Sequence, residues 1–156
     1  MRYIIYGAGG VGGAIGARLF QHGHETVFIC RGEHHAVLQR RGLTFKTPNE
    51  TLQLRVRTVG HPAELKFTKN DTVILTMKSH DTESALRDLI RVGGSDVAIV
   101  CAQNGVDNER LAARPTHSSS QTKDAALPLH LPLRLHAVAP ISCSASASAV
   151  RWPVRL

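Results

Sequence analysis

Glycines recur at a fixed spacing near the start of the chain, in the stretch IIYGAGGVGGAIG at residues 4–16. Glycine admits positive φ angles and close approach to the backbone but weakens regular structure, so a cluster of glycines needs a reason. The spacing Gly7-x-Gly9-x-x-Gly12 is typical of dinucleotide-binding folds, in which these glycines turn the chain, admit a pyrophosphate and allow helix–strand packing. A glycine-rich turn that serves only tight packing is the alternative. The predicted cofactor-binding residues of this loop are Gly7, Ala8, Gly9, Gly10, Val11 and Gly12.

The residue expected to distinguish NAD from NADP follows the apolar run at residues 26–30. Dinucleotide-binding folds place an acidic residue near the end of the second strand for NAD and a basic one for NADP. Arg31 occupies this place, and its guanidinium can pair with a 2′-phosphate through two parallel hydrogen bonds. Glu33 could bind a ribose instead, although a carboxylate also suits the first turn of a helix. We favour NADP as the cofactor.

Alternating strands and helices would bring these residues together. Apolar, β-branched runs predict strands at residues 3–6, 26–30, 72–78 and 97–102. Helices are expected at residues 14–20, 33–41, 81–90 and 107–113. This order implies an α/β fold of the Rossmann type, a doubly wound and mainly parallel sheet.

A hairpin is expected between the second helix and the third core strand. Residues 43–47 and 52–59 alternate in polarity on either side of a turn at residues 48–50. In the second run Leu52, Leu54 and Val56 share one face, and arginines lie on the other. We therefore expect residues 52–59 to form one strand with a solvent-exposed side.

The composition indicates which kinds of binding partner suit the chain. Nineteen Lys and Arg against twelve Asp and Glu give a net charge of +7, which suits an anionic small ligand. Arg40-Arg41 is the only adjacent basic pair, so the sequence gives little support for nucleic acid as a partner. No apolar run approaches the roughly 20 residues that span a bilayer, and the N-terminus lacks a secretory pattern.

Cysteines and histidines show no metal-binding spacing, so we expect no metal site. The three cysteines are Cys30, Cys101 and Cys143. The first two lie in apolar runs and are expected to pack in the core. Three cysteines form no even disulfide framework, which favours a reducing, cytoplasmic compartment.

Five separated motifs are together more specific than the glycine loop alone. They are GAGGVGGAIGARL, GHETVFICR, GLTF, DTVILTMKSHDTESAL and QNGVDNERLAA. With them the chain resembles the N-terminal, NADP-binding domain of the ketopantoate reductase (2-dehydropantoate 2-reductase) family over about residues 1–114. The resemblance implies NADPH-dependent reduction of ketopantoate, a small 2-keto acid, to pantoate in pantothenate biosynthesis.

The resemblance also implies roles for individual residues. Arg31 and Lys78 would both approach the 2′-phosphate of NADPH, and Asn104 would lie beside the nicotinamide and the substrate. From the residues alone, a lysine such as Lys78 is more often a solvated side chain at the end of a strand, and Asn104 with Gly105 is sufficient as a turn.

The composition changes near residue 114. All thirteen glycines lie at or before Gly105, whereas five of the seven prolines lie beyond residue 114. We expect an NADP-binding domain at residues 1–114 and a poorly ordered, low-complexity tail at residues 115–156, or alternatively an extended segment against the domain.

The family's helical C-terminal domain, with its catalytic lysine, is expected to be absent. Lys123 matches no family motif, so no catalytic residue is assigned. An alternative function follows, namely an NADP-binding module without catalytic turnover. The sequence leaves the oligomeric state open.

Overall fold

A computed structural model describes residues 1–93 and 96–103 of the chain. The first half contains β1 (Arg2–Tyr6), α1 (Gly10–Gln21), β2 (Glu25–Ile29), α2 (Gly32–Arg41), β3 (Leu43–Lys46) and β4 (Thr51–Leu54). It is followed by β5 (Arg57–Val59), η1 (Pro62–Glu64), β6 (Asp71–Leu75), η2 (Ser79–Asp81), α3 (Thr82–Arg91) and β7 (Ala98–Cys101), where η marks a 3₁₀ turn.

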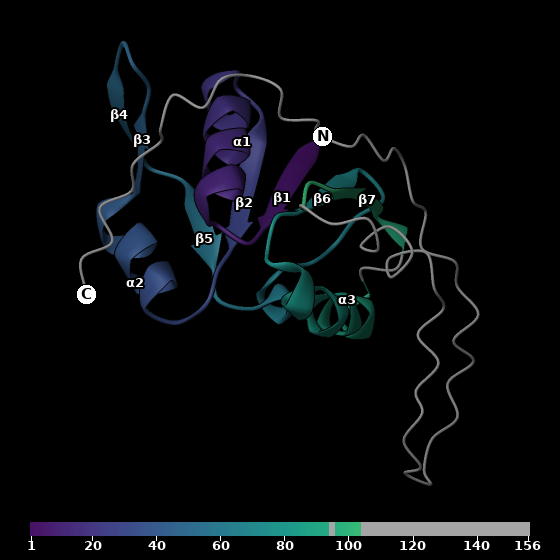
Figure 1. Cartoon of the computed structure of the whole chain (residues 1–156). Helices are drawn as coiled ribbons and strands as arrows, with labels where there is room; N and C mark the ends of the chain where they lie inside the picture. Colours follow the sequence, from purple (N-terminus) through teal and green to yellow (C-terminus); the bar gives the residue numbers. More distant parts are fainter. Residues whose placement is uncertain (94–95, 104–156) are drawn as a thin grey trace, which may run out of the picture.

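The core is a parallel five-stranded sheet in the order β5-β2-β1-β6-β7 (Figure 1). Successive residues of β1 enter two different hydrophobic clusters: Ile4 packs with Leu86 and Leu89 of α3, and Ile5 packs with Ala17 of α1. Because side chains alternate between the faces of a strand, helices cover both faces of the sheet. The predicted α/β, Rossmann-type doubly wound sheet is confirmed.

The strand order places a reversal at β1. β1 pairs with β2 on one side and with β6 on the other, so the chain winds outward in both directions from this strand. In open α/β sheets a ligand binds outside the carboxyl ends of the strands at such a switch point. The end of β1, where the glycine loop begins, is therefore the place to look for a site.

Two predicted element boundaries were wrong near the glycine loop and after the third core strand. α1 begins at Gly10 rather than at residue 14, because packing against the sheet overrides the low helix propensity of glycine. β6 ends at Leu75, and residues 76–78 continue beyond the sheet.

The predicted hairpin is present, but its second strand is not one strand. β3 and β4 form a separate antiparallel pair, and β4 ends at Leu54. The chain then joins the main sheet, where β5 pairs with β2 from Arg57 onward. Exposure alternates through residues 51–58. A period of two therefore gives no sign that the hydrogen-bonding partner changes.

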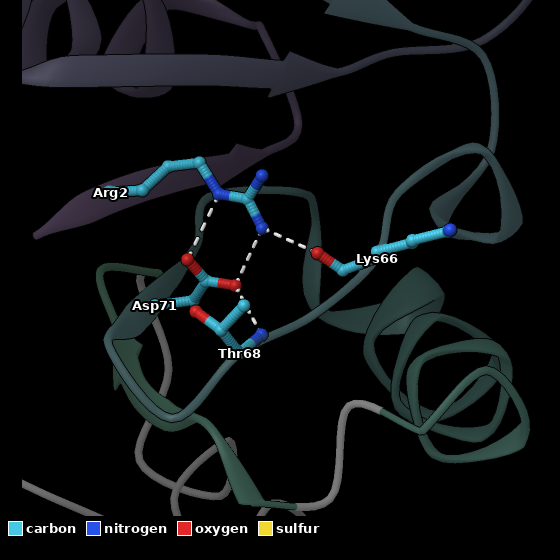
Figure 2. Close-up of polar contacts among 4 residues, drawn as sticks. All are labelled: Arg2, Lys66, Thr68 and Asp71. Atoms are coloured by element: carbon cyan, nitrogen blue, oxygen red, sulfur yellow. Dashed lines mark hydrogen bonds and ion pairs between the residues drawn. The ribbon is translucent and has the colours of Figure 1, made fainter.

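An ion pair joins the amino ends of β1 and β6 (Figure 2). Arg2 donates from Nε to Asp71 Oδ1 at 2.9 Å and from a terminal nitrogen to Asp71 Oδ2 at 2.6 Å. The same terminal nitrogen donates to the Lys66 carbonyl, and the Thr68 amide donates to Asp71 Oδ2. The hydrogen bond to Asp71 raises the pKa of Arg2. This cluster fixes the end of the sheet opposite the glycine loop.

Several predictions fall outside the described residues, namely the helix at residues 107–113, the tail at residues 115–156, Asn104 and Cys143. The domain boundary at residue 114 stays a prediction for the same reason. Within residues 1–93 and 96–103, no helix has both the length and the apolar character needed to cross a membrane.

Candidate nucleotide-binding site

A cavity of about 320 Å³ opens beside the carboxyl ends of β1 and β2 and the segment that follows β6. Its position coincides with the switch point of the sheet. It is lined by Tyr6, Gly7, Ala8, Gly9, Ile29, Cys30, Arg31, His34, Met77, Asp81 and Ala85. Three of the predicted loop residues and Arg31 are thus brought together in one hollow.

The three motif glycines are required for different reasons. Gly7 has a φ of 107°, and a Cβ there would lie 2.7 Å from the Met77 nitrogen. A Cβ on Gly12 would lie 2.1 Å from the Gly7 carbonyl oxygen. At Gly9, by contrast, no atom of the described residues lies within 4 Å of the Cβ position apart from those of Gly9 and its two chain neighbours. Packing explains the first and third glycines, whereas Gly9 keeps a space open beside the cavity.

The amino end of α1 faces this loop. Gly9 caps the helix without a side-chain hydrogen bond, and its carbonyl accepts from the Gly13 amide at 2.7 Å. The amides of the first turn have no acceptor within the helix and carry partial positive charge, which suits a phosphate. Gly10, Val11 and Gly12 belong to this turn and do not line the cavity.

Two side chains that sequence analysis did not single out hold the loop in place. The His34 ring nitrogen Nε2 lies 2.8 Å from the Ala8 carbonyl oxygen, and because a carbonyl only accepts, Nε2 carries the proton. The Thr76 hydroxyl donates to the carbonyls of Tyr6 and Gly7. His34 is in the first turn of α2, close after Arg31, but a histidine in an exposed helical turn gave no signal of this contact.

Arg31 lines the cavity and lies next to a residue of α3. One of its terminal nitrogens lies 3.5 Å from Asp88 Oδ2, which also lies 3.6 Å from His61 Nε2. The Tyr6 hydroxyl beside it is the main cause of the raised pKa of Arg31, and Asp88 adds to it. Burial raises the pKa of Tyr6. The Tyr6 hydroxyl has no partner in hydrogen-bond geometry among the described residues.

Cys30 contributes a neutral surface to the cavity. It is buried and free, and burial raises the pKa of its thiol to about 11. Cys101 is also buried, so the predicted packing role of both cysteines is confirmed. Within the described residues no group of three or more His, Cys, Asp or Glu is arranged to hold a metal ion.

Comparison with known proteins decides the family. The model of the family described as "Ketopantoate reductase PanE/ApbA" matches residues 3–121. The chain belongs to the ketopantoate reductase family. Among curated relatives, a 2-dehydropantoate 2-reductase of Pyrococcus horikoshii is 32% identical over 122 residues, which are 74% of this chain and 38% of the relative. One of Archaeoglobus fulgidus is 32% identical and covers 72% of this chain and 35% of the relative.

Solved structures agree with this assignment. A PanE/ApbA family ketopantoate reductase of Ralstonia eutropha matches with a TM-score of 0.65 and 30% identity, over 71% of this chain and 37% of that one. A D-mandelate dehydrogenase solved with NADH and anilino(oxo)acetate matches with a TM-score of 0.63 and 27% identity, over 71% and 36%. The chain therefore spans little more than a third of the length of these ketopantoate reductase relatives.

Lys78, which the family resemblance implied, and Glu33, the alternative ribose ligand, are less well placed. Lys78 is exposed at the start of η2 and does not line the cavity, although its neighbour Met77 does. Glu33 is exposed in the first turn of α2 and does not line the cavity either.

One further residue orders the loop that precedes Asn104. Gln103 Nε2 donates to the Met77 carbonyl and to the Thr82 hydroxyl, each at 2.8 Å. These bonds tie the end of β7 to the segment between β6 and α3. Gln103 thus positions the start of the Gln-Asn-Gly motif next to the cavity-lining segment.

Proposed function

We propose that this chain binds NADPH and represents the cofactor-binding part of a reductase that converts ketopantoate, a 2-keto acid, to pantoate in cytoplasmic pantothenate biosynthesis. The observation that carries the proposal is one cavity at the switch point of the sheet that combines the open space at Gly9 with the guanidinium of Arg31. Relatives with ketopantoate reductase names support the substrate class.

The residues present fit a dinucleotide with a 2′-phosphate. Gly9 and the first-turn amides of α1 would receive the pyrophosphate, because the backbone there is open and its amides are unpaired within the helix. Arg31 would bind the 2′-phosphate, and Lys78 would add a second positive charge from the β6 side. Among the residues that line the cavity, the one that follows β2 and Cys30 is this arginine and not an acid, which favours NADP over NAD.

The chemistry of the reaction would come from the bound NADPH, which supplies a hydride to the keto carbon. Asn104 would lie beside the nicotinamide and the substrate, where an amide can donate and accept without titrating. No residue is proposed as catalyst. Reduction of a 2-keto acid needs a group that donates a proton to the former carbonyl oxygen and a group that binds the carboxylate. The family resemblance assigns neither group to a residue of this chain.

A second candidate function is NADP binding without turnover. It is favoured by the lining of the cavity, which brings together the glycine loop and Arg31 for a nucleotide, whereas no residue of this chain is assigned as catalyst. The experiment that separates the candidates mixes the purified chain with NADPH and ketopantoate and follows NADPH oxidation. Oxidation that depends on ketopantoate retires the second candidate. NADPH binding without oxidation retires the first, and an unchanged NADPH fluorescence on adding protein contradicts both.

A further inference from the structure

Asp88 faces the guanidinium to which the proposed function assigns the 2′-phosphate. It lies on α3, three residues after Ala85, and Ala85 lines the cavity. Residues three apart are neighbours on a helix surface, so Asp88 lies one turn beyond the cavity wall. Its Oδ2 atom is 3.5 Å from a terminal nitrogen of Arg31. The guanidinium of Arg31 therefore lies against a carboxylate.

This ion pair is weak enough to be exchanged. A distance of 3.5 Å exceeds the roughly 2.7–2.9 Å of a charge-assisted hydrogen bond. The Arg31 side chain is 54% exposed, whereas that of Asp88 is 23% exposed. The same Asp88 oxygen is shared with His61 at 3.6 Å. A phosphate, which offers more charge and two oxygens to the guanidinium fork, can replace Asp88 as the partner of Arg31.

We propose that Asp88 is a specificity-determining residue that reduces the preference of the site for nucleotides carrying a 2′-phosphate. The proposal rests on the proposed function, because it takes Arg31 as the 2′-phosphate ligand. A 2′-phosphate has to displace Asp88 from Arg31, and the displaced carboxylate then remains nearby as a like charge. A nucleotide with a free 2′-hydroxyl meets neither cost.

Among the groups around Arg31, Asp88 is the one expected to compete with a 2′-phosphate. Tyr6 lies beside the guanidinium but is an uncharged phenol near neutral pH, so it does not repel a phosphate. Asp81 also lines the cavity and adds an electrostatic interaction with Arg31, whereas the carboxylate of Asp88 lies within ion-pair distance of the guanidinium. Neutralising Asp88 thus removes the carboxylate in contact with Arg31 and leaves the guanidinium to the ligand.

The test measures nucleotide binding to the full 156-residue chain by calorimetry at one fixed ionic strength. The probes are adenosine 2′,5′-bisphosphate and 5′-AMP, which differ only in the 2′-phosphate. In Asp88→Asn the ratio of the two affinities should shift about twofold to fivefold toward the bisphosphate, as expected for an exposed ion pair. Asp88→Ser should shift it in the same direction, which guards against an effect peculiar to the asparagine amide.

Glu83→Gln is the matched control. It removes one negative charge from the same helix, but Glu83 pairs with Arg87 on an exposed surface and does not line the cavity. The affinity ratio of this variant should equal that of the wild-type chain. A shift as large as in the Asp88 variants would mean that any charge on α3 acts, which overturns the proposal.

Other outcomes are equally decisive. A ratio that stays unchanged or falls in both Asp88 variants overturns the proposal, and a fall would make Asp88 a residue that positions Arg31 for the phosphate. Loss of the folded state in both variants, seen by circular dichroism, would make Asp88 structural and also overturns it. If the wild-type chain binds neither nucleotide, the proposed function fails and takes this inference with it.

Discussion

Arg31 combines a fixed positive charge with a position at the edge of the cavity. Its guanidinium does not titrate near neutral pH, and its present partner is a carboxylate held at a long distance. Its side chain, half of which is exposed, can therefore reorient toward a ligand at little cost. Lys78 is exposed and does not line the cavity. Its proposed role depends on the family resemblance alone.

Replacing either cation tests the cofactor assignment. Arg31→Ala should weaken NADPH binding about tenfold to a hundredfold, because hydrogen bonds to charged groups contribute about 1.5–3 kcal/mol. Lys78→Ala should also weaken NADPH binding, and NADH binding should change little in both variants. Fluorescence titration with the two cofactors provides the measurement. Arg40→Ala, an exposed arginine on α2, is the control, and equal losses for NADPH and NADH would refute the 2′-phosphate assignment.

Cys30 makes the stability of the protein sensitive to alkaline pH. Burial raises the pKa of its thiol from 9.0 to about 11. Between these values the unfolded chain loses this proton while the folded protein keeps it, so the free energy of unfolding falls as pH rises through this window. The contribution of Cys30 should be about 1 kcal/mol smaller at pH 10 than at pH 8.

Urea unfolding at the two pH values measures this effect. Cys30→Ala is the reference, since it keeps all other titrating groups. The difference in unfolding free energy between wild type and variant should narrow from pH 8 to pH 10. A constant difference would show that the thiol titrates as it does in the unfolded chain.

At the scale of the elements, two glycines at the junction of β1 and α1 differ in their surroundings. Gly12 lies against the Gly7 carbonyl and the Thr76 hydroxyl, and Gly9 has open space at its Cβ position. Packing thus explains the glycine at position 12, whereas packing does not explain Gly9, where the proposed pyrophosphate would approach the backbone. The same kind of substitution should have opposite consequences at the two positions.

Alanine at each glycine provides this comparison. Gly12→Ala should lower the stability by about 1–3 kcal/mol, the usual cost of forcing a group into a packed site. Gly9→Ala should leave the melting temperature nearly unchanged and weaken NADPH binding, because the methyl group occupies the approach to the backbone. Thermal unfolding and NADPH titration of both variants check the prediction. Unchanged affinity in Gly9→Ala would contradict the proposed pyrophosphate position.

The ion pair of Arg2 and Asp71 should contribute strongly to the free energy of unfolding. It lies at the end of the sheet opposite the glycine loop. Arg2→Ala would leave the carboxylate of Asp71, which is 2% exposed, with one amide donor from Thr68. Losing one partner of a buried pair costs about 3–5 kcal/mol. We expect a loss near the lower limit, about 3 kcal/mol, because Arg2 itself is partly exposed. Urea unfolding measures it, and a loss below 1 kcal/mol would show that water replaces the guanidinium.

The helices and four of the five strands of the main sheet were predictable because each is a local pattern; β5 was not. β2, for example, has an exposed Glu25 followed by a buried, mostly β-branched run at residues 26–29, as expected for a strand covered on both faces. The split between β4 and β5 was not predictable, because polarity alternates without a break while the pairing partner changes.

The candidate site was predictable only in part, for a similar reason. The glycine spacing and Arg31 follow directly from the sequence of one βαβ unit. The contacts of Arg31 with Asp88 and of His34 with Ala8 join residues from different elements. No local periodicity encodes such contacts, so they become visible only once the sheet order is known.

For the molecule as a whole, ligand binding and folding should be coupled through the site. The cavity is built from the ends of β1 and β2, the start of α2 and the segment from β6 to α3, so it exists only in the folded chain. A ligand that binds only this state raises the free energy of unfolding by RT ln(1 + [L]/Kd), about 2.7 kcal/mol at a hundredfold excess over Kd. NADPH should therefore raise the melting temperature in proportion to the logarithm of its concentration.

Thermal melting over a series of NADPH and NADH concentrations tests this coupling on the intact chain. NADPH should give the larger shift at each concentration, and Arg31→Ala should bring the two series together because the 2′-phosphate then loses its guanidinium. Arg40→Ala should keep them apart. If NADPH leaves the melting temperature unchanged at saturating concentrations, the cavity does not bind this cofactor in the folded state, whatever the family of the chain.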